Sequence, residues 1–324
     1  MRRSLALACL CALVVAGTAL GAEPGFTPPD PASPNAERIN DSYLWIALFT
    51  GAIFVVVQGA LIWFIVRYRA DRRRREDEGA QIHGNTNLEI AWTVAPVLIL
   101  AAIGTFIFYK LPGIADIPGA RADGGRTDIA VTGYRYYWQF EYENGVVAVD
   151  RLRAPARRNV RLQITSQESD VIHSWWIPRL GGKFDAIPGK VNETWFNAEA
   201  PGIYRGQCAE FCGIQHAAMT AEVEAMPKAE FEQWLEEEAR AQENGTSNLG
   251  EETFRGACAK CHALDGSGGI GPRLTGNPTL QEDRLVERIV RNGRRNMPPI
   301  GPDWQDRQME ALVRYLQEDL SGGG

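Results

Sequence analysis

Gly206-Gln-Cys208-Ala-Glu-Phe-Cys212-Gly-Ile-Gln-His216-Ala-Ala-Met219-Thr220 is the stretch from which the rest of the chain can be interpreted. It brings two thiols, an imidazole and a thioether close together in sequence, and a second histidine, His173, precedes it. This soft ligand set suits copper rather than magnesium or calcium. The C-x3-C spacing allows each sulfur to bridge two metal ions, and five side-chain ligands exceed the four of a tetrahedral zinc site. The stretch therefore predicts a dinuclear copper site.

Each of these residues also has an ordinary structural interpretation. Taken singly, Cys208 and Cys212 suit a disulfide, and Met219 suits a position in an apolar core. A metal site accounts for all of them together.

The sequence around this stretch has the pattern of a β-rich domain. Short runs alternate apolar and polar residues and are separated by Gly, Pro, Asn and Asp. The clearest runs are Thr127–Gly133, Val160–Ser166, Val191–Ala198 and Thr220–Glu224. We expect an antiparallel sandwich or barrel of about 100 residues, placed at residues 125–226, followed by a helix and a polar linker at residues 227–248.

A second cofactor motif follows at Cys258-Ala-Lys-Cys261-His262. Two thiols at this spacing form thioether bonds to a c-type heme, and the adjacent imidazole binds its iron. Met297 is the expected sixth ligand, because a thioether raises the reduction potential and closes the iron to small molecules; an ordinary apolar contact is its alternative interpretation.

Residues 249–324 are therefore expected to form an all-α cytochrome c domain. The predicted helices are Glu251–Lys260, Glu282–Asn292 and Asp306–Asp319, with a Gly/Pro-rich loop at Gly266–Pro278. So small a core normally needs a covalent or metal staple, which the heme supplies.

Two apolar stretches earlier in the chain predict a transmembrane hairpin. Tyr43–Val66 has 24 residues without a charge and would span roughly 36 Å as a helix, enough to cross a bilayer. Ile90–Leu111 has no charge before Lys110. The loop at residues 67–89 is rich in arginine and should remain in the cytoplasm. The β-rich and cytochrome domains then lie outside.

The N-terminus has the three parts of a secretory signal at residues 1–22: a basic start, an apolar run and small residues ending near Ala22. A first transmembrane helix, or a lipoprotein site at Cys9, are the alternatives. Residues 23–42 form an N-terminal segment before the hairpin. Removal of the signal leaves four cysteines, all of them within the two cofactor motifs, so we expect no disulfide.

Composition and charge exclude one class of function. The net charge is -6, and the only dense basic cluster is the short run from Arg67 to Arg75. A nucleic-acid-binding protein would need a basic patch elsewhere.

Several segments together resemble cytochrome c oxidase subunit II over about residues 40–235. They are Gly133–Tyr142, His173–Trp176, Asp185–Gly189, and Gly206–Gly213 with His216 and Met219. The added domain is similar to that of bacterial oxidases whose subunit II is fused to a cytochrome c. The resemblance implies a cupredoxin-like barrel that holds the mixed-valence copper A centre, on the outer side of the bacterial inner membrane.

The resemblance also implies roles for single residues. The backbone carbonyl of Glu210 would bind one copper, and its carboxylate a magnesium ion shared with subunit I. Glu89, at the start of the second membrane helix, would lie at the mouth of a proton channel; position alone equally suits an interfacial carboxylate. The carbonyl of Pro272 would orient the His262 ring.

The aromatic run from Tyr134 to Phe140 has two interpretations. It suits a strand that packs aromatic side chains into a core, or an electron-transfer surface beside the copper. Trp138 keeps its family counterpart. Tyr136 stands where many members have the tryptophan that accepts electrons from soluble cytochrome c, so the route through Tyr136 and Trp138 departs from the family pattern.

The implied function is that of the electron-accepting subunit of a proton-pumping cytochrome c oxidase. A donor, cytochrome c or a quinol–cytochrome c reductase, reduces the heme at His262 and Met297. The electron then passes to copper and to the heme of subunit I, where oxygen becomes water. The expected partners are subunits I and III and membrane lipid. No catalytic residue is expected on this chain, and its linker keeps the two redox sites at high effective concentration.

Three other functions compete with this hypothesis. A quinol oxidase subunit shares the hairpin and barrel but lacks the copper ligands, which are complete here from His173 to Met219. A membrane-anchored copper chaperone has no use for a second redox cofactor. A nitrous-oxide reductase needs a further large metal domain.

Overall fold

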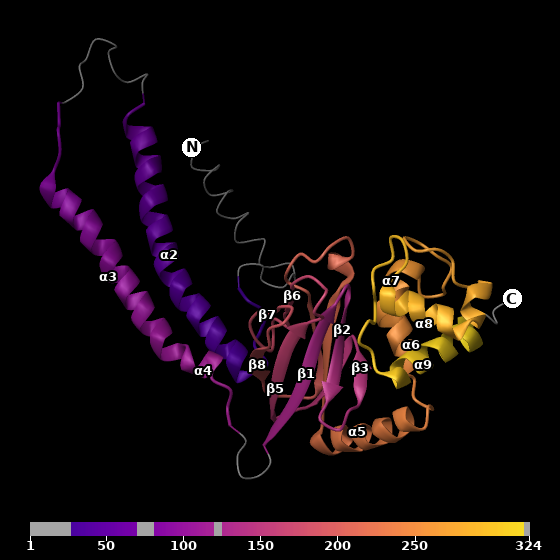
Figure 1. Ribbon diagram of the computed structural model, residues 1–324. Coiled ribbons are helices and arrows are strands. Elements are labelled where there is room, and N and C mark those ends of the chain that lie inside the picture. The colour runs from indigo at the N-terminus through magenta and orange to yellow at the C-terminus, as the bar shows by residue number, and fades with distance from the viewer. Residues whose placement is uncertain (1–26, 70–80, 120–124, 321–324) are drawn as a thin grey trace, which may run out of the picture. The chain divides into compact units, whose positions relative to one another are not determined.

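The computed structural model describes residues 27–69, 81–119 and 125–320 (Figure 1). The expected signal segment at residues 1–22, with Cys9, lies outside the described residues, as do residues 70–80 of the arginine-rich loop. Two compact units are present, the helical hairpin and the remainder of the chain.

The hairpin consists of two long apolar helices with exposed surfaces. They are α2 (Pro34–Arg67) and α3 (Thr86–Lys110), followed by the short α4 (Pro112–Ala115). Both are long and apolar enough to cross a membrane. Trp45 of α2 stacks on Phe106 of α3, with ring centroids 4.9 Å apart, and Lys110 Nζ lies 2.7 Å from Asp41 Oδ2. Aromatic and ionic contacts therefore join the two helices near one end.

The β-rich region forms two main sheets and a separate two-stranded ribbon. The strand orders are β3-β2-β1-β5-β8, β4-β10-β9 and β6-β7. The strands are β1 (Arg126–Tyr134), β2 (Tyr137–Tyr142), β3 (Val147–Val149), β4 (Arg151–Pro155), β5 (Asn159–Ser166), β6 (His173–Trp175), β7 (Phe184–Ala186), β8 (Asn192–Phe196), β9 (Gly202–Gln207) and β10 (Thr220–Met226).

Of the two expected architectures, the sandwich is confirmed, whereas a closed barrel and purely antiparallel pairing are not. The strands form open sheets that pack as a sandwich rather than closing into a barrel. Two of the pairs, β1 with β5 and β10 with β4, are parallel. Alternation of apolar residues reports which face of a strand is buried, but it does not specify the neighbouring strand or its direction.

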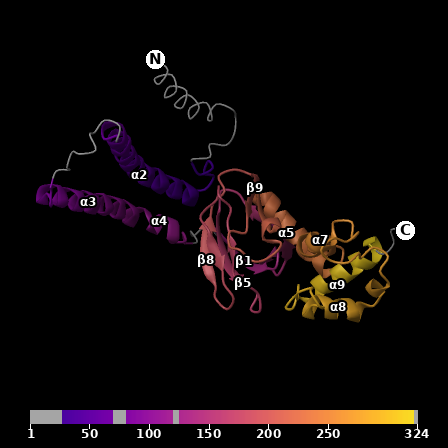
Figure 2. The same ribbon diagram turned by 90° about the horizontal axis from the view of Figure 1, so that it is seen from above.

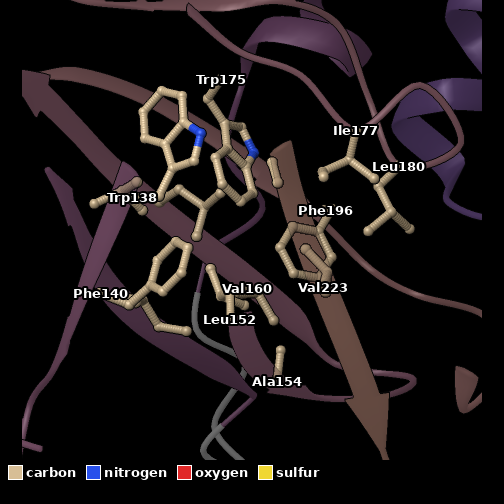
Figure 3. Close-up of a cluster of buried hydrophobic side chains, with 14 of the residues drawn as sticks. Trp138, Phe140, Leu152, Ala154, Val160, Trp175, Ile177, Leu180, Phe196 and Val223 are labelled. Carbon is tan, nitrogen blue, oxygen red and sulfur yellow. The ribbon is translucent and has the colours of Figure 1, made fainter. Parts of the chain in front are cut away.

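The core lies between the sheets and follows the period-two pattern of the strands. In β5, Val160, Leu162 and Ile164 are fully buried while the residues between them are partly exposed. Figure 3 shows Trp138, Phe140 and Trp175 gathered in this core. The Trp138 and Trp175 rings meet edge to face at 5.2 Å, an arrangement that aromatic pairs favour.

Helix α5 (Lys228–Glu243) closes one end of the sandwich and leads the chain onward (Figure 1). Its Phe231 is buried in the sandwich core. Near its C-terminal end, the amide of Gln242 accepts a hydrogen bond from Val147 N at 3.1 Å and donates one to Val147 O at 2.7 Å. The side chain thus pairs with the edge strand β3 much as a neighbouring strand would.

The C-terminal region is helical and packs against the β3 side of the sandwich (Figure 1). Figure 2 shows the same helical region beside the sheets, near α5. Its elements are α6 (Leu249–Thr253), the π-helical turn η3 (Phe254–Cys258), α7 (Ala259–His262), the 3-10 turn η4 (Pro278–Gln281), α8 (Asp283–Asn292), α9 (Asp306–Tyr315) and the π-helical turn η5 (Leu316–Leu320). Its core includes Phe254 and Leu312 together with Tyr134, Tyr137 and Val149 of the β region. The two regions therefore share one hydrophobic cluster.

Candidate functional site

The predicted copper ligands converge at one end of the sandwich. His173 Nδ1 lies 4.0 Å from Cys208 Sγ. Cys212 Sγ lies 3.5 Å from His216 Nδ1 and 3.9 Å from Met219 Sδ. The ligand atoms of His173, Cys208 and Cys212 all lie within 4.8 Å of one another. The four side chains of the ligand loop and the distant His173 thus surround one small volume.

Local backbone structure explains this convergence. The ligand loop runs from the end of β9 to the start of β10, and the 3-10 turn η2 (His216–Ala218) bends it back on itself. Cys208 N donates to Met219 O at 2.9 Å, which closes the loop. Ala209 N donates to Ser174 O at 2.9 Å, which fixes the loop to β6 beside His173. These two main-chain hydrogen bonds therefore hold the ligand loop closed and place it beside His173.

The two thiols influence each other's ionisation. The hydrogen bond with Cys212 lowers the pKa of Cys208, and the same bond, together with burial, raises the pKa of Cys212. The pair therefore favours a thiolate at Cys208, which is the form that binds metals.

Asp170 lies behind His173, on the side of the ring away from the thiols. Its Oδ2 is 3.7 Å from His173 Nε2, and it accepts hydrogen bonds from Arg135 N at 2.7 Å and Arg135 Nε at 2.5 Å. Burial disfavours the charged imidazole, but the contacts with Asp170 and Cys208 outweigh burial and raise the pKa of His173. Sequence inspection missed Asp170, whose only signal is its position three residues before a ligand.

The backbone of Glu210 takes part in this site, whereas its side chain does not. The Glu210 carbonyl oxygen lies 3.3 Å from Cys208 Sγ, and the carboxylate is exposed. Two large apolar side chains on the same loop are also exposed, Phe211 by 77% and Ile214 by 76%. The loop therefore presents an apolar surface with a carboxylate at its margin.

The predicted heme-attachment motif lies on the short helix α7 and the turn before it. Cys258 and Cys261 are free thiols, and burial raises the pKa of Cys258 to about 12. His262 Nδ1 donates a hydrogen bond to the carbonyl of Pro272 at 2.8 Å. Gly271 lies so close to the imidazole that a Cβ there would be 2.5 Å from His262 Cε1. The loop thus fixes the ring and leaves its Nε2 for a ligand.

Met297 lies in a tight turn before two prolines. Arg294 N donates to Met297 O at 2.9 Å, and Met297 N donates to Arg294 O at 3.0 Å. The side chain is partly buried and packs against the cluster that contains Cys258. The turn therefore holds a thioether against the same hydrophobic cluster as the attachment motif.

Family models match three parts of the chain. Residues 22–109 match the transmembrane domain of cytochrome C oxidase subunit II, residues 145–226 match its periplasmic domain, and residues 246–316 match subunit III of the cbb3-type oxidase. Cytochrome c oxidase subunit 2 of Alkalihalophilus pseudofirmus is 33% identical over 320 residues, which are 91% of this chain and 91% of that protein. The chain belongs to the cytochrome c oxidase subunit II family.

Two further proteins are similar to this subunit II. Cytochrome c oxidase subunit 2 of Cereibacter sphaeroides is 31% identical over 252 residues, which are 66% of this chain and 79% of that protein. The crystal structure of the periplasmic domain of subunit II of cytochrome oxidase from Bradyrhizobium japonicum is 32% identical; it covers 38% of this chain and 97% of that chain, with a TM-score of 0.35.

The family matches establish a membrane-anchored subunit of a heme-copper oxidase with an external domain and a cytochrome c domain. These domains imply copper and heme, and the residues of this subunit II fit both groups. Two buried thiols with histidines at 3.5 and 4.0 Å make a donor set for soft metals. At the other site, the close approach of Gly271 to an oriented imidazole leaves that ring free to bind iron through Nε2.

The two aromatic residues expected on the electron route have different surroundings in this subunit II. Trp138 is fully buried, and its ring centroid lies 6.1 Å from that of His173. Tyr136 lies against the ligand loop, because a Cβ on Gly213 would be 2.6 Å from its hydroxyl oxygen. Its carbonyl accepts a hydrogen bond from Lys260 Nζ at 2.8 Å. Tyr136 thus contacts both cofactor segments.

Glu89 lies in the first turn of α3, as expected, and belongs to the other compact unit. Its Oε1 accepts a hydrogen bond from Asn85 N at 3.3 Å, while Asn85 Oδ1 caps the helix by accepting from Leu88 N at 3.1 Å. The carboxylate therefore forms part of a helix N-terminus, where negative charge is favourable.

Proposed function

We propose that this subunit accepts electrons on its cytochrome domain and delivers them from its copper loop to subunit I of a proton-pumping terminal oxidase. The observation that carries the proposal is the convergence of His173, Cys208 and Cys212 within 4.8 Å, with His216 and Met219 beside Cys212. The donors are cytochrome c or a quinol–cytochrome c reductase, and oxygen is reduced in subunit I.

Bound copper and covalently attached heme supply one-electron redox chemistry. The residues of this chain hold the ligands in place and limit water. His173 is fully buried and Met219 likewise, so solvent has little access to that side of the copper site, a property that tunes metal centres. Main-chain hydrogen bonds from Ala209 N to Ser174 O and from Cys208 N to Met219 O hold the loop in this arrangement.

The copper assignment is tested by spectroscopy of the purified, copper-loaded chain. We expect Cys212→Ser and His216→Ala to lose the near-infrared band of a mixed-valence copper pair while the heme remains reducible. His83→Ala is the matched control, because His83 is exposed and far in sequence from the ligands. Survival of the band in Cys212→Ser contradicts the assignment.

The heme assignment has a separate test. Heme should remain attached to the denatured wild-type chain and be lost from the double variant Cys258→Ser/Cys261→Ser. Turnover of the purified oxidase with and without added cytochrome c then identifies the donor. Undiminished turnover in Cys212→Ser would show that electrons bypass the proposed route.

Glu210 and Glu89 are proposed to serve the assembled oxidase. The exposed Glu210 carboxylate is available to a magnesium ion shared with subunit I; with manganese as a probe, Glu210→Gln should abolish its paramagnetic signal in the complex. Glu89→Gln should slow proton uptake with copper spectra intact. An unchanged manganese signal in Glu210→Gln would reject the role of Glu210 in magnesium binding. Unchanged turnover in Glu89→Gln would reject the role of Glu89 in proton uptake.

The membrane topology is also a proposal. Both helices are taken to cross the bacterial inner membrane with the arginine-rich loop inside, because Arg67 ends α2 and positive charge favours the cytoplasm. Alkaline phosphatase fused after Arg67 should be inactive, and fused after Lys110 it should be active. N-terminal sequencing of the mature protein tests cleavage near Ala22.

A further inference from the structure

Lys260, the residue between the two heme-attachment thiols, is held by the copper domain at three points. Its Nζ lies 2.5 Å from Asp150 Oδ2 and donates to Tyr136 O at 2.8 Å. Its own carbonyl accepts from Gln215 Nε2 at 2.9 Å. Gln215 directly precedes the copper ligand His216, so a single hydrogen bond connects the two cofactor motifs.

Asp150 is itself rigidly placed. Its Oδ1 accepts from Trp138 N at 2.9 Å and its own N donates to Trp138 O at 2.8 Å. The Lys260 side chain is only 13% exposed in this pair. Because buried charge pairs lose much of their hydration, they are favourable only when geometry and further hydrogen bonds are satisfied, as they are here.

The segment that follows Met297 is also held by the copper domain. Tyr137 Oη donates to the carbonyl of Ile300 at 2.7 Å and accepts from Trp304 Nε1 at 2.8 Å. Tyr134 Oη donates to Asp303 Oδ1 at 2.8 Å. The two tyrosine rings stack at 4.8 Å with an interplanar angle of 3°. Ile300 lies three residues after Met297, so these bonds hold the segment that carries the thioether.

The turn before the attachment motif also packs closely against the edge strand of the copper domain. Gly256, in the turn before the attachment motif, faces Val149, and a Cβ at that position would lie 2.5 Å from Val149 Cγ1. Tyr137 is completely buried and Tyr134 is 4% exposed. Contacts of this closeness fix one relative position of the two segments, since packed interiors deform little.

We propose that Tyr134, Tyr137, Asp150 and Gln215 of the copper domain are positioning residues for the heme site. They hold the attachment motif through Lys260 and the Met297 turn through Ile300. Met297 would therefore remain in place as the sixth ligand of a bound heme only while the copper domain holds both segments. The proposal rests on the proposed function, in which Met297 is that ligand.

The test uses the full, heme-loaded chain and carbon monoxide, which binds ferrous heme when the sixth position opens. Tyr137→Phe keeps the ring but leaves the Ile300 carbonyl and Trp304 Nε1 without their buried partner. We expect an open population about ten-fold larger, with a lower midpoint potential, because loss of a thioether ligand lowers it.

Tyr204→Phe is the matched control, since Tyr204 is also buried and donates to a backbone carbonyl, that of Ala200 at 2.8 Å, within the copper domain. Asp150→Asn is the second variant: asparagine retains the acceptor for Trp138 N and removes the charge that holds Lys260. Both Tyr137→Phe and Asp150→Asn should bind more carbon monoxide than Tyr204→Phe.

Met297→Leu distinguishes the assignment of Met297 as a heme ligand from the positioning role of the copper domain. If it does not open the iron to carbon monoxide, the ligand assignment fails, and the positioning role fails with it. If it does open the iron while Tyr137→Phe and Asp150→Asn behave like Tyr204→Phe, only the positioning role is overturned.

Discussion

At the scale of single residues, the most informative side chain is one that binds no metal. Asp170 receives two hydrogen bonds from Arg135 and faces the outer nitrogen of His173. Carboxylates in this position orient imidazole ligands and increase their basicity. The proposed copper site is therefore expected to depend on a residue outside the ligand motif.

Asp170→Asn should weaken copper binding about 10- to 100-fold, the usual effect of removing such a partner. Competition titration of the purified chain with a copper chelator measures this. Asp185→Asn is the control, because Asp185 is exposed on the neighbouring strand β7. Equal affinities of the two variants would show that Asp170 does not support the site.

Among the secondary-structure elements, α5 has a more specific role than its amphipathic pattern indicates. Its Gln242 forms two hydrogen bonds with Val147 and so protects the edge of β3. Unprotected edge strands invite pairing with other chains. The strand that α5 protects also contributes Val149 to the cluster shared with the cytochrome domain.

Gln242→Ala should lower the free energy of unfolding by about 1–3 kcal/mol, because both Val147 groups lose a buried partner. Gln233→Ala provides the comparison, since Gln233 hydrogen-bonds only to Glu237 on the exposed face of the same helix; its effect should remain within about 0.5 kcal/mol. Urea titration of both variants in detergent measures the difference, and similar midpoints would refute the role of Gln242.

Helix α6 contributes a pH dependence. Burial raises the pKa of Glu252 above its ordinary value of 4.5, although Arg153 Nη2 lies 3.4 Å from its carboxylate. The folded chain thus retains this proton to a higher pH than the unfolded chain does. The contribution of Glu252 to stability is therefore fully present below pH 4.5 and is lost as pH rises through the folded pKa.

Glu252→Gln should remove the loss of stability that the wild-type carboxyl causes as pH rises. Relative to wild type, the variant should become progressively more stable as pH rises above 4.5, and the difference should reach a constant value once the wild-type carboxyl is ionised. Unfolding free energies measured over a pH series test this. A difference that does not vary with pH would exclude Glu252 as its source.

At the scale of the whole molecule, the β-rich and cytochrome domains share one hydrophobic cluster. Tyr134, Tyr137 and Val149 belong to the same hydrophobic cluster as Phe254 and Leu312. Calorimetry of the full chain should therefore show both domains unfolding in one transition.

Gly256→Val should split that transition in two, because the added side chain would meet Val149, where a Cβ on Gly256 would lie 2.5 Å from Val149 Cγ1. Gly119→Val is the control, since a Cβ on Gly119 would have no neighbour within 4 Å. A single transition in Gly256→Val would show that the shared cluster tolerates separation at this point.

Sequence information sufficed for features that depend on local pattern. The alternation in β5 and the run of apolar residues in α2 depend only on neighbouring positions, and the cofactor motifs list their ligands at fixed spacing. The parallel pairing of β1 with β5 could not be read in this way, since pairing joins residues distant in sequence.

The supporting contacts were hidden for the same reason. Lys260 lies 124 residues from Tyr136, and Tyr137 lies 163 residues from Ile300. A lysine inside an attachment motif and a tyrosine inside a strand each have an ordinary interpretation alone. Each residue meets its distant partner only in the folded chain, and no periodic pattern in the sequence predicts such a contact.

The shared hydrophobic cluster also changes the role expected of the segment between α5 and α6. Thr246 N and Ser247 N both donate to Ala241 O, and Gly245 O accepts from the Arg314 guanidinium. If the interface and not the segment sets the separation of the two redox sites, extra glycine and serine residues after Asn244 should leave the intramolecular electron-transfer rate unchanged; a rate that fell with each added residue would contradict this. The segment would then be only a covalent connection between the domains, and its length could vary during evolution without changing the rate of electron transfer between the two redox sites.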